Sequence, residues 1–256
     1  MFGSRFGNNA SSSAAGFEFG NALDFDGIND NVTASDVSIA GASTTAVTVS
    51  LWMKPDSITS GTNQIVFSTA NSNTETFGLQ KRDGSGTGYM RMFVRDGSSN
   101  YVEFQSALSS TNWQHVFIVY DGSQATSDNR VKMWVDSTEI TAKTSSVADQ
   151  PTSISSACLS NFTTGVWAST VSFTKVYYGG ILDEFAIWTD YVGNGTEAAS
   201  LYNSGNGALA TDVISSPERY YRLNESGSTA TAADDSGNSN TGTLNNFTLP
   251  GAWVAH

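Results

Sequence analysis

Residues 113–135, WQHVFIVYDGSQATSDNRVKMWV, carry the pattern that decides the fold. Apolar side chains fill every second position in two runs of this stretch: Val116, Ile118 and Tyr120, and then Val131, Met133 and Val135. Because successive side chains along a strand point to opposite faces, each run predicts a strand with one buried face. Asp121-Gly122 ends the first run, as turn chemistry requires. The stretch therefore predicts β-structure.

The same alternation recurs in other parts of the chain. It appears at Val47, Val49, Leu51 and Met53, and again at Met90, Met92 and Val94. Short runs separated by Gly, Asn, Asp and Ser continue over residues 17–188, which is typical of a β-sandwich. We expect the buried faces to form one core, and its predicted members include Val49, Leu51, Val116, Ile118, Val135 and Ile187.

The composition agrees with an all-β fold of two sheets with one short helix. Of 256 residues, 24 are glycine and only 14% are charged, which favours strands and turns over surface helices. The helix is expected at residues 197–201, with Thr196 as its N-cap and Gly205 beyond its end. All-α folds are excluded.

One domain with two decorated ends is predicted. Residues 1–16 are small and polar and are expected to form a flexible arm. Residues 17–208 form the sandwich, and residues 209–256 form a C-terminal extension. Its apolar side chains need a surface, either on the sandwich or on a neighbouring chain, and we predict a homo-oligomer or docking onto a larger assembly.

The charge and the cysteine count exclude several partners and cofactors. A formal net charge of −12 repels phosphate backbones, and no Lys/Arg cluster stands in the sequence to offset it. We therefore expect no nucleic-acid partner. One cysteine and two histidines exclude an internal disulfide and a Cys/His zinc site. With no long apolar run and no secretory leader pattern, neither membrane insertion nor the common secretory route is expected.

Five ordered motifs resemble the laminin-G-like members of the concanavalin A-like lectin/glucanase superfamily. They are LDFDGIND at 23–30, VSLWMKP at 49–55, the paired segments at 113–122 and 131–136, GILDEFAIW at 180–188, and LYNSG at 201–205. The resemblance implies a jelly roll of two antiparallel sheets.

Two features depart from the family pattern. Ser137 replaces the usual glycine after the hairpin Asp, so that turn is expected to be altered. Residues 234–244 resemble a stretch that often precedes the first motif, and they are expected to add a strand to this sandwich or to a neighbour.

Carboxylate placement argues against catalysis. Glycoside hydrolysis needs two carboxyl groups on either side of the scissile bond. Asp183 and Glu184 are adjacent, and adjacent strand residues are expected to point to opposite faces. The sequence has no nucleophile motif for which His115 could act as the base, so we expect His115 to be structural. The chain is therefore predicted not to be an enzyme.

Two kinds of binding site are predicted. Asp26, Asn29 and Asp30 offer hard oxygen ligands within one turn, which makes calcium a candidate cofactor, although tight turns use the same residues. Stacking on a glycan or a protein is the second kind, with ring-bearing candidates at Trp167, Phe173, Tyr177 and Tyr178. Trp167 and Phe173 are expected at the surface, whereas Trp52, Trp113, Trp134 and Trp188 are expected in the core.

Three functions remain open. The preferred one is a non-catalytic structural or interaction module on the surface of a phage virion, which contacts other virion proteins or itself, with glycans as further candidate partners. It accounts for a lectin-like fold without a leader or disulfides. The alternatives are a secreted or cell-surface lectin domain, with an extracellular location, and a glycoside hydrolase, which the carboxylate placement disfavours.

Overall fold

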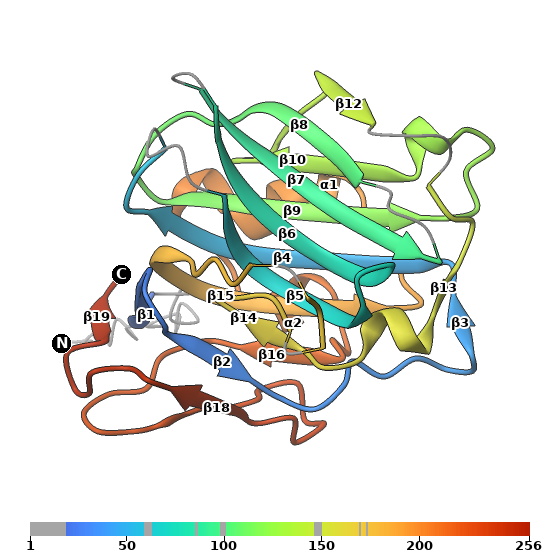
Figure 1. Ribbon diagram of the computed structural model, residues 1–256. Coiled ribbons are helices and arrows are strands. Elements are labelled where there is room, and N and C mark those ends of the chain that lie inside the picture. Colours follow the sequence, from blue (N-terminus) through green and yellow to red (C-terminus); the bar gives the residue numbers. More distant parts are fainter. Residues whose placement is uncertain are drawn as a thin grey trace, which may run out of the picture.

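The computed structural model describes residues 19–58, 63–84, 87–97, 101–145, 150–168, 170–172 and 174–256. The arm predicted at residues 1–16 lies outside these ranges. Two large antiparallel sheets pack face to face (Figure 1), so the predicted all-β two-sheet sandwich is confirmed.

The first sheet has eight strands in the order β11-β10-β9-β4-β15-β1-β19, with β16 beside β15. Their bounds are β1 Asn21–Asp26, β4 Ala46–Pro55, β9 Gln114–Asp121, β10 Val131–Val135, β11 Thr138–Glu139, β15 Gly179–Thr189, β16 Arg219–Tyr221 and β19 Trp253–Ala255. Strands β4, β9 and β10 are neighbours and contain the alternating runs that predicted them.

The second sheet has nine strands in the order β12-β8-β7-β6-β5-β14-β2-β18-β17. Their bounds are β2 Asn31–Thr33, β5 Gln64–Ser72, β6 Glu75–Gly84, β7 Thr87–Asp96, β8 Tyr101–Leu108, β12 Lys143–Ser145, β14 Thr163–Thr164, β17 Thr231–Ala232 and β18 Gly242–Asn245. A separate pair joins β3 (Ser43–Thr44) to β13 (Ile154–Ser155).

The core lies between the two sheets. All six side chains predicted to be inside are buried there, namely Val49, Leu51, Val116, Ile118, Val135 and Ile187. Phenylalanines from the second sheet meet them; Phe67, for example, contacts Phe185 with ring centroids 5.4 Å apart. Burial of this alternating set drives the two faces together.

The C-terminal residues complete both sheets of their own chain. Strand β16 pairs with β15, β19 with β1, and β18 with β2. Tyr220 and Tyr221 are each 1% exposed, and Leu223 and Trp253 are also buried. Residues 209–256 therefore pack on the sandwich itself, and their apolar side chains do not require a neighbouring chain.

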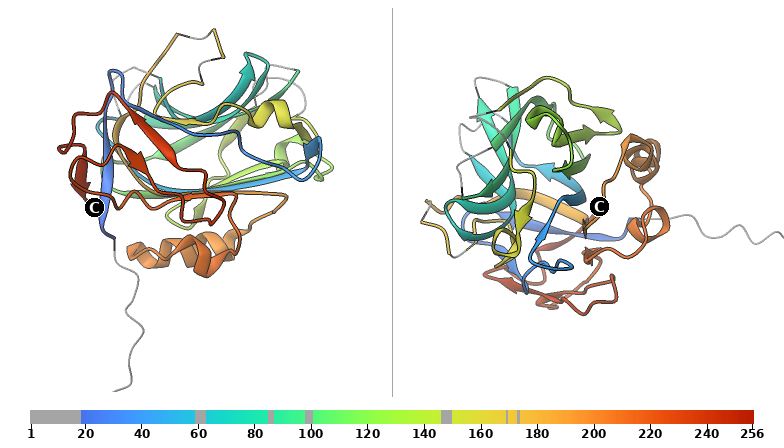
Figure 2. Two further views of the ribbon diagram at one scale, coloured as in Figure 1. Left: turned by 90° about the horizontal axis from the view of Figure 1, so that it is seen from below. Right: turned by 90° about the vertical axis from the view of Figure 1, so that its right-hand side faces the viewer.

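Short helices cover the outer face of the eight-stranded sheet (Figure 2). Helix α1 spans Gly195–Tyr202, and its N-cap is Asn194, not Thr196 as expected. The Asn194 side chain accepts from Thr196 N while Glu197 reaches back to Asn194 N, which forms a capping box. A one-turn helix, α2, spans Ala210–Val213, and 3-10 turns η1 (Ser127–Asn129), η2 (Ser156–Leu159) and η3 (Asn203–Gly205) link other elements. Within the described ranges, no helix is long and apolar enough to cross a membrane.

The hairpin turn at Ser137 uses a backbone conformation that favours glycine. Ser137 has φ +63° and Asp136 has φ +48°, both in the left-handed region. The Asp136 carboxylate accepts a hydrogen bond from His115 N at 2.8 Å, which holds the turn against β9. The altered turn expected at Ser137 stays a prediction.

Candidate functional site

Strands β6 and β7 present a polar and aromatic outer face. Their register places Gln80 opposite Arg91. Since Met92 lies in the core, strand alternation turns Arg91, Phe93 and Arg95 to the opposite side of the sheet. This face is turned away from the eight-stranded sheet and from the helices.

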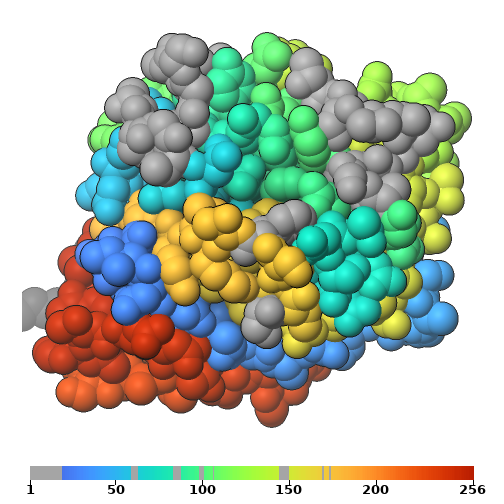
Figure 3. All heavy atoms as spheres, in the orientation of Figure 1, coloured from blue at the N-terminus to red at the C-terminus, as the bar shows by residue number. Residues whose placement is uncertain are grey.

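The chain between β14 and β15 folds across this face. The Trp167 ring meets the Phe93 ring edge-on, with centroids 4.9 Å apart. Ala168 N donates to Ser68 Oγ at 2.9 Å, which ties the segment to β5. In Figure 3 this segment, in gold, lies beside the teal atoms of β5 and β6. A small apolar cluster, separate from the main core, anchors the segment: Ile65, Ala70, Phe93, Trp167, Ala168 and Val171.

A cavity of about 280 Å³ lies between the sheet face and this segment. It is lined by Asn63, Gln80, Arg91, Phe93, Arg95, Trp167, Thr174 and Val176. Gln80 is 6% exposed, and its Oε1 has no hydrogen-bond partner. A buried acceptor without a hydrogen bond lowers the free energy of unfolding, and a hydrogen-bond donor from a ligand would remove that cost.

Arginine guanidinium groups supply the charge at this cavity. Arg91 donates from Nε and Nη2 to Glu103 Oε2, at 3.3 and 2.9 Å, and its guanidinium lies 3.8 Å from the Tyr101 ring centroid. Arg95 lies 4.4 Å from the Phe93 ring centroid. Burial, together with the positive charge of Arg91, lowers the pKa of Arg95 to about 10, which still leaves it charged at neutral pH.

This basic region was missed from the sequence. We expected no Lys/Arg cluster to offset the negative charge, and the fold brings three arginines together. Arg82 and Arg91 both contact Glu103, and Arg95 lines the same cavity as Arg91. A signal was present. The run Met90, Met92 and Val94 predicts a buried face, and the residues between them must therefore face outward.

The aromatic candidates are placed differently from the expectation. Trp167 is only 4% exposed and Tyr178 is fully buried, so the prediction of an exposed Trp167 ring is wrong and neither ring offers an open stacking face. Tyr177 is half-buried and forms an isolated bridge with Ile65. Phe173 lies outside the described residues. Trp52, Trp134 and Trp188 are buried as expected, whereas Trp113 is half-buried.

The acidic pair on β15 does not obey strand alternation. A bulge interrupts the β15–β4 register between Asp183 and Ala186, and Glu184 has φ +49°. Both carboxylates consequently reach the helix-covered face: Glu184 accepts from Tyr220, which packs beside α1, while Asp183 meets His256, which packs against Trp52. The expectation of opposite faces is therefore wrong, because a bulge shifts the side-chain phase by one residue.

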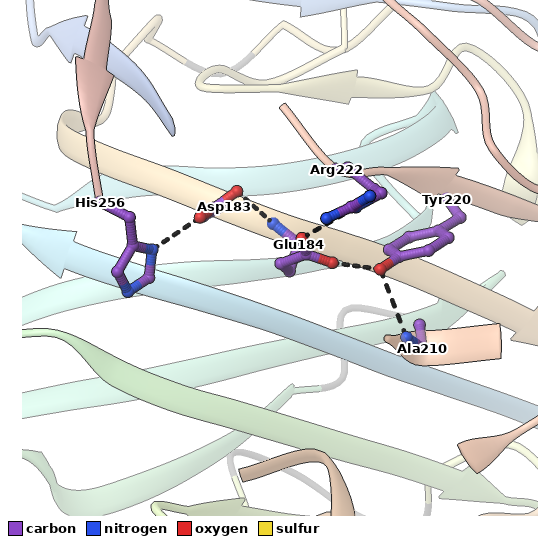
Figure 4. Close-up of polar contacts among 6 residues, drawn as sticks. All are labelled: Asp183, Glu184, Ala210, Tyr220, Arg222 and His256. Carbon is purple, nitrogen blue, oxygen red and sulfur yellow. Dashed lines mark hydrogen bonds and ion pairs between the residues drawn. The ribbon is translucent and has the colours of Figure 1, made fainter. Parts of the chain in front are cut away.

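Both carboxyl groups are buried and hydrogen-bonded to neighbouring protein groups (Figure 4). Asp183 is fully buried and Glu184 is 4% exposed. Glu184 also accepts from Arg222 Nε at 3.3 Å, and Asp183 accepts from Glu184 N at 2.9 Å. Burial raises the pKa of Asp183 to about 9 and that of Glu184 to about 7. Their oxygens are engaged by protein groups, and neither residue lines any cavity described here.

His115 is also enclosed. It is 1% exposed, its Nε2 lies 2.9 Å from Ser50 Oγ, and burial lowers its pKa to about 3. A neutral, buried imidazole beside a serine could act as a base only if a substrate reached it. Trp52 and Tyr202 lie over this position, with Tyr202 stacked 5.9 Å from Trp52 and 6.4 Å from His115.

The predicted calcium residues form a hydrogen-bonded turn. Asp26 Oδ1 accepts from Ile28 N at 2.7 Å and from Asn29 N at 3.1 Å, while Asp30 Oδ2 accepts from Asp26 N at 3.0 Å. Asp30 Oδ1 is buried without a partner beside a cavity of about 290 Å³ that Asp24 and Asp26 also line. No group of three or more His, Cys, Asp or Glu side chains in the described ranges is placed to hold a metal. The free Asp30 oxygen is the feature that fits a hard cation, so calcium stays a prediction.

A larger cavity, of about 330 Å³, opens on the other sheet. Val119, Lys132 and Trp134 line it together with the residues before α1. Its Asp121 carboxylate is engaged by Ser123 and Gln124, at 2.6 and 2.5 Å. Because the Asp121 carboxylate is already hydrogen-bonded, whereas Gln80 Oε1 has no partner, this cavity makes a weaker demand for a ligand than the one beside Gln80.

A family model described as concanavalin A-like lectin/glucanases superfamily matches residues 26–198. No curated protein sequence matches this chain closely enough to count as a relative. The match covers four of the segments that carried the resemblance in full, at 49–55, 113–122, 131–136 and 180–188, and the segment at 23–30 in part. It ends before the segment at 201–205.

Solved structures with the same fold share little sequence with this chain. A protein from Bacteroides ovatus named for carbohydrate binding superposes with a TM-score of 0.60 and 14% identity, over 91% of this chain and 60% of that one. A heptameric SAP-like pentraxin from Limulus polyphemus gives 0.53 and 17%, over 73% and 83%. Tailspike protein 2 of an Escherichia coli O157:H7 bacteriophage gives 0.51 and 15%, over 84% and 31%. The chain thus spans three fifths of the first of these proteins and about a third of the tailspike.

Proposed function

The chain belongs to the concanavalin A-like lectin/glucanases superfamily, and on this premise we propose that it is a non-catalytic module that binds glycans on the outer face of its nine-stranded sheet. The fold is lectin-like and is shared with a protein named for carbohydrate binding. The observation that carries the proposal is the cavity beside Gln80, where a buried amide oxygen lacks a partner and two guanidinium groups line the wall. Ligand pockets use a small number of such polar groups to orient what they bind.

The absence of catalysis in this proposal rests on the acidic pair. A glycosidase must place two carboxyl groups on either side of a bond in a substrate cleft. Asp183 and Glu184 are instead buried and engaged with His256, Tyr220 and Arg222. A substrate could not approach them without removal of the covering residues.

A glycan array tests the binding proposal. The full chain should bind a defined set of glycans, and Gln80→Ala should remove that binding. Lys132→Ala, in the cavity of the other sheet, is the matched control and should leave binding unchanged. Binding lost in the Lys132 variant and kept in the Gln80 variant would move the site to the other sheet and contradict the proposal.

A place on a phage particle is the second part of the proposal, with an extracellular lectin as the alternative. It is supported by the phage tailspike that contains the same fold over 84% of this chain. On a particle the module would contact other virion proteins or copies of itself. Antibodies against the chain should label purified phage particles from a host strain that carries its coding sequence, and particles that carry no trace of the chain would refute this location.

A further inference from the structure

The hydrogen-bonding groups at the cavity beside Gln80 specify what a ligand must offer. Gln80 Oε1 is an acceptor without a partner, so it needs a donor such as a hydroxyl. Arg91 uses Nε and Nη2 on Glu103, and its Nη1 has no hydrogen-bond partner among the described residues. A guanidinium has donors only, so it needs an acceptor. The two demands together fit a ligand that carries both a hydroxyl and a strong acceptor.

The charge at the cavity has the opposite sign to that of the whole chain. The net charge is −12, yet two arginines and no acidic residue appear among the described residues that line the cavity. Glu103, behind Arg91, is shared between Arg82 at 2.5 Å and Arg91 at 2.9 Å, so one carboxylate faces two guanidinium groups. Arg95 donates from Nη1 to Asn73 O at 2.9 Å. A negative group that reached both Arg91 and Arg95 would be held by charge-assisted hydrogen bonds.

The walls and the size of the cavity restrict the ligand further. The apolar side of the cavity is small, because Phe93 and Trp167 are buried against each other and only Val176 is partly exposed. The cavity volume of about 280 Å³ fits a small group rather than a long chain. An extended polyanion such as a nucleic acid would also be repelled by the remaining surface, because the chain as a whole is acidic.

We propose that this cavity binds a carboxylate-bearing sugar of the uronic-acid or sialic-acid class, with its carboxylate on Arg91 and Arg95 and a hydroxyl on Gln80. The inference rests on the proposed glycan-binding function and names the ligand class. Arg91 and Arg95 select for the acid, while Gln80 selects for a hydroxyl of the sugar that carries it.

Matched acid and ester probes test the charge requirement. Calorimetric titration of the full chain would compare trigalacturonic acid with its methyl ester, and 3′-sialyllactose with its methyl ester. We expect at least one acid to bind and its ester to bind about tenfold or more weakly, since charge-assisted hydrogen bonds are lost. Sodium acetate in excess should not displace the acid sugar, because it lacks the hydroxyl and the ring. Displacement by acetate at equal concentration would overturn the sugar assignment.

Two variants and one control locate the contact. Arg91→Gln should weaken binding of the acid about tenfold or more. Arg82→Gln removes a contact to the same Glu103 but does not line the cavity, so it should change the affinity by less than about twofold. Gln80→Met removes an unpaired buried acceptor, so it should fold at least as stably as the parent chain and still bind the acid more weakly.

The outcomes separate this inference from the function beneath it. If neutral glycans bind on an array, and the ester binds as tightly as the acid with Arg91→Gln unchanged, the acidic-sugar inference fails and the glycan-binding function stands. If no acidic or neutral glycan binds on the array, both fail. Equal weakening by Arg91→Gln and Arg82→Gln would show that Glu103 pairing, and not ligand contact, is responsible, and would also overturn the inference.

Discussion

His256 Nδ1 lies 2.6 Å from Asp183 Oδ2, and both groups are enclosed. The imidazole is stacked between Phe19 and Trp113, with ring centroids 3.5 and 3.8 Å away. Burial lowers the pKa of His256 to about 4 and raises that of Asp183 to about 9, so each group favours its neutral form and one proton is held between them. This hydrogen bond fastens the residue after β19 to the middle of β15.

The first prediction is that the chain loses stability between pH 7 and pH 9. Asp183 has a folded pKa far above its unfolded value, so its contribution to stability is complete at low pH and is lost as pH rises through about 9. The pKa values of His256 and His115 are lowered in the folded chain. Both histidines are neutral in the folded and the unfolded chain above pH about 6.5, so they add no pH dependence there. The free energy of unfolding should fall by up to about 1.4 kcal/mol per pH unit from Asp183 alone.

Asp183→Asn should flatten this decline, because the amide does not titrate. Glu184→Gln is the matched control. Burial raises the pKa of Glu184 to only about 7, so its removal should leave most of the slope above pH 7 in place. Melting temperatures of the three chains at pH 7, 8 and 9 would measure this, and parallel curves for the parent chain and Asp183→Asn would refute it.

The second prediction concerns the core between the sheets. Ile118 is fully buried on β9 and belongs to the main core. Ile118→Ala should lower the free energy of unfolding by about 2 to 4 kcal/mol through lost transfer energy and a residual cavity. Ile28→Ala, at a residue 71% exposed, is the control and should change it by less than about 0.5 kcal/mol. Denaturant unfolding with equal losses for both variants would contradict the two-sheet core.

The main elements of the fold could be predicted because period-two alternation reports directly on a buried strand face. The strands around Val49, Val116 and Met133 follow from that pattern alone. The bulge at Glu184 was not predicted, although the sequence carries a sign of it: Leu182 and Phe185 both lie in the core and are separated by two acidic residues, which breaks the period of two. The pairing of β18 and β19 within their own chain could not be predicted, because it joins strands that are far apart in the sequence.

The third prediction is that no glycosidic bond is hydrolysed. Asp183 and Glu184 are closed off by His256, Tyr220 and Arg222, so no sugar reaches them. Incubation with β-glucans and with any glycan that binds should release no reducing ends. Release that disappears in both Asp183→Asn and Glu184→Gln would show that the covering residues open and that the chain is an enzyme.

The fourth prediction addresses calcium at the turn of Asp26, Asn29 and Asp30. Burial raises the pKa of Asp30, and its Oδ1 has no partner, so a cation there would relieve the site. Excess chelator should lower the melting temperature of the calcium-loaded chain, because a ligand bound to the native state alone stabilises it. Asp30→Asn should remove the effect, whereas Asp212→Asn on α2 should not. A melting temperature that chelator leaves unchanged would exclude the site.

The residues of the proposed binding site differ in how far the sequence predicts them. Arg91, Phe93 and Arg95 could have been found by taking the outward face of the β7 run as well as its buried face. The burial of Trp167 could not, because it depends on the segment between β14 and β15 folding back over Phe93. An aromatic ring near a turn gives no sign of which sheet face it will cover.

Hydrogen–deuterium exchange of the full chain, with and without the tightest-binding glycan from the array, tests whether glycans bind on the outer face of the nine-stranded sheet. We expect slower exchange in β6, in β7 and in the segment between β14 and β15, where the cavity beside Gln80 lies. Residues 129–139 and 192–195 around the larger cavity should exchange at the same rate in both states. Protection confined to those residues, with β6 and β7 unchanged, would show that the glycan binds on the eight-stranded sheet instead.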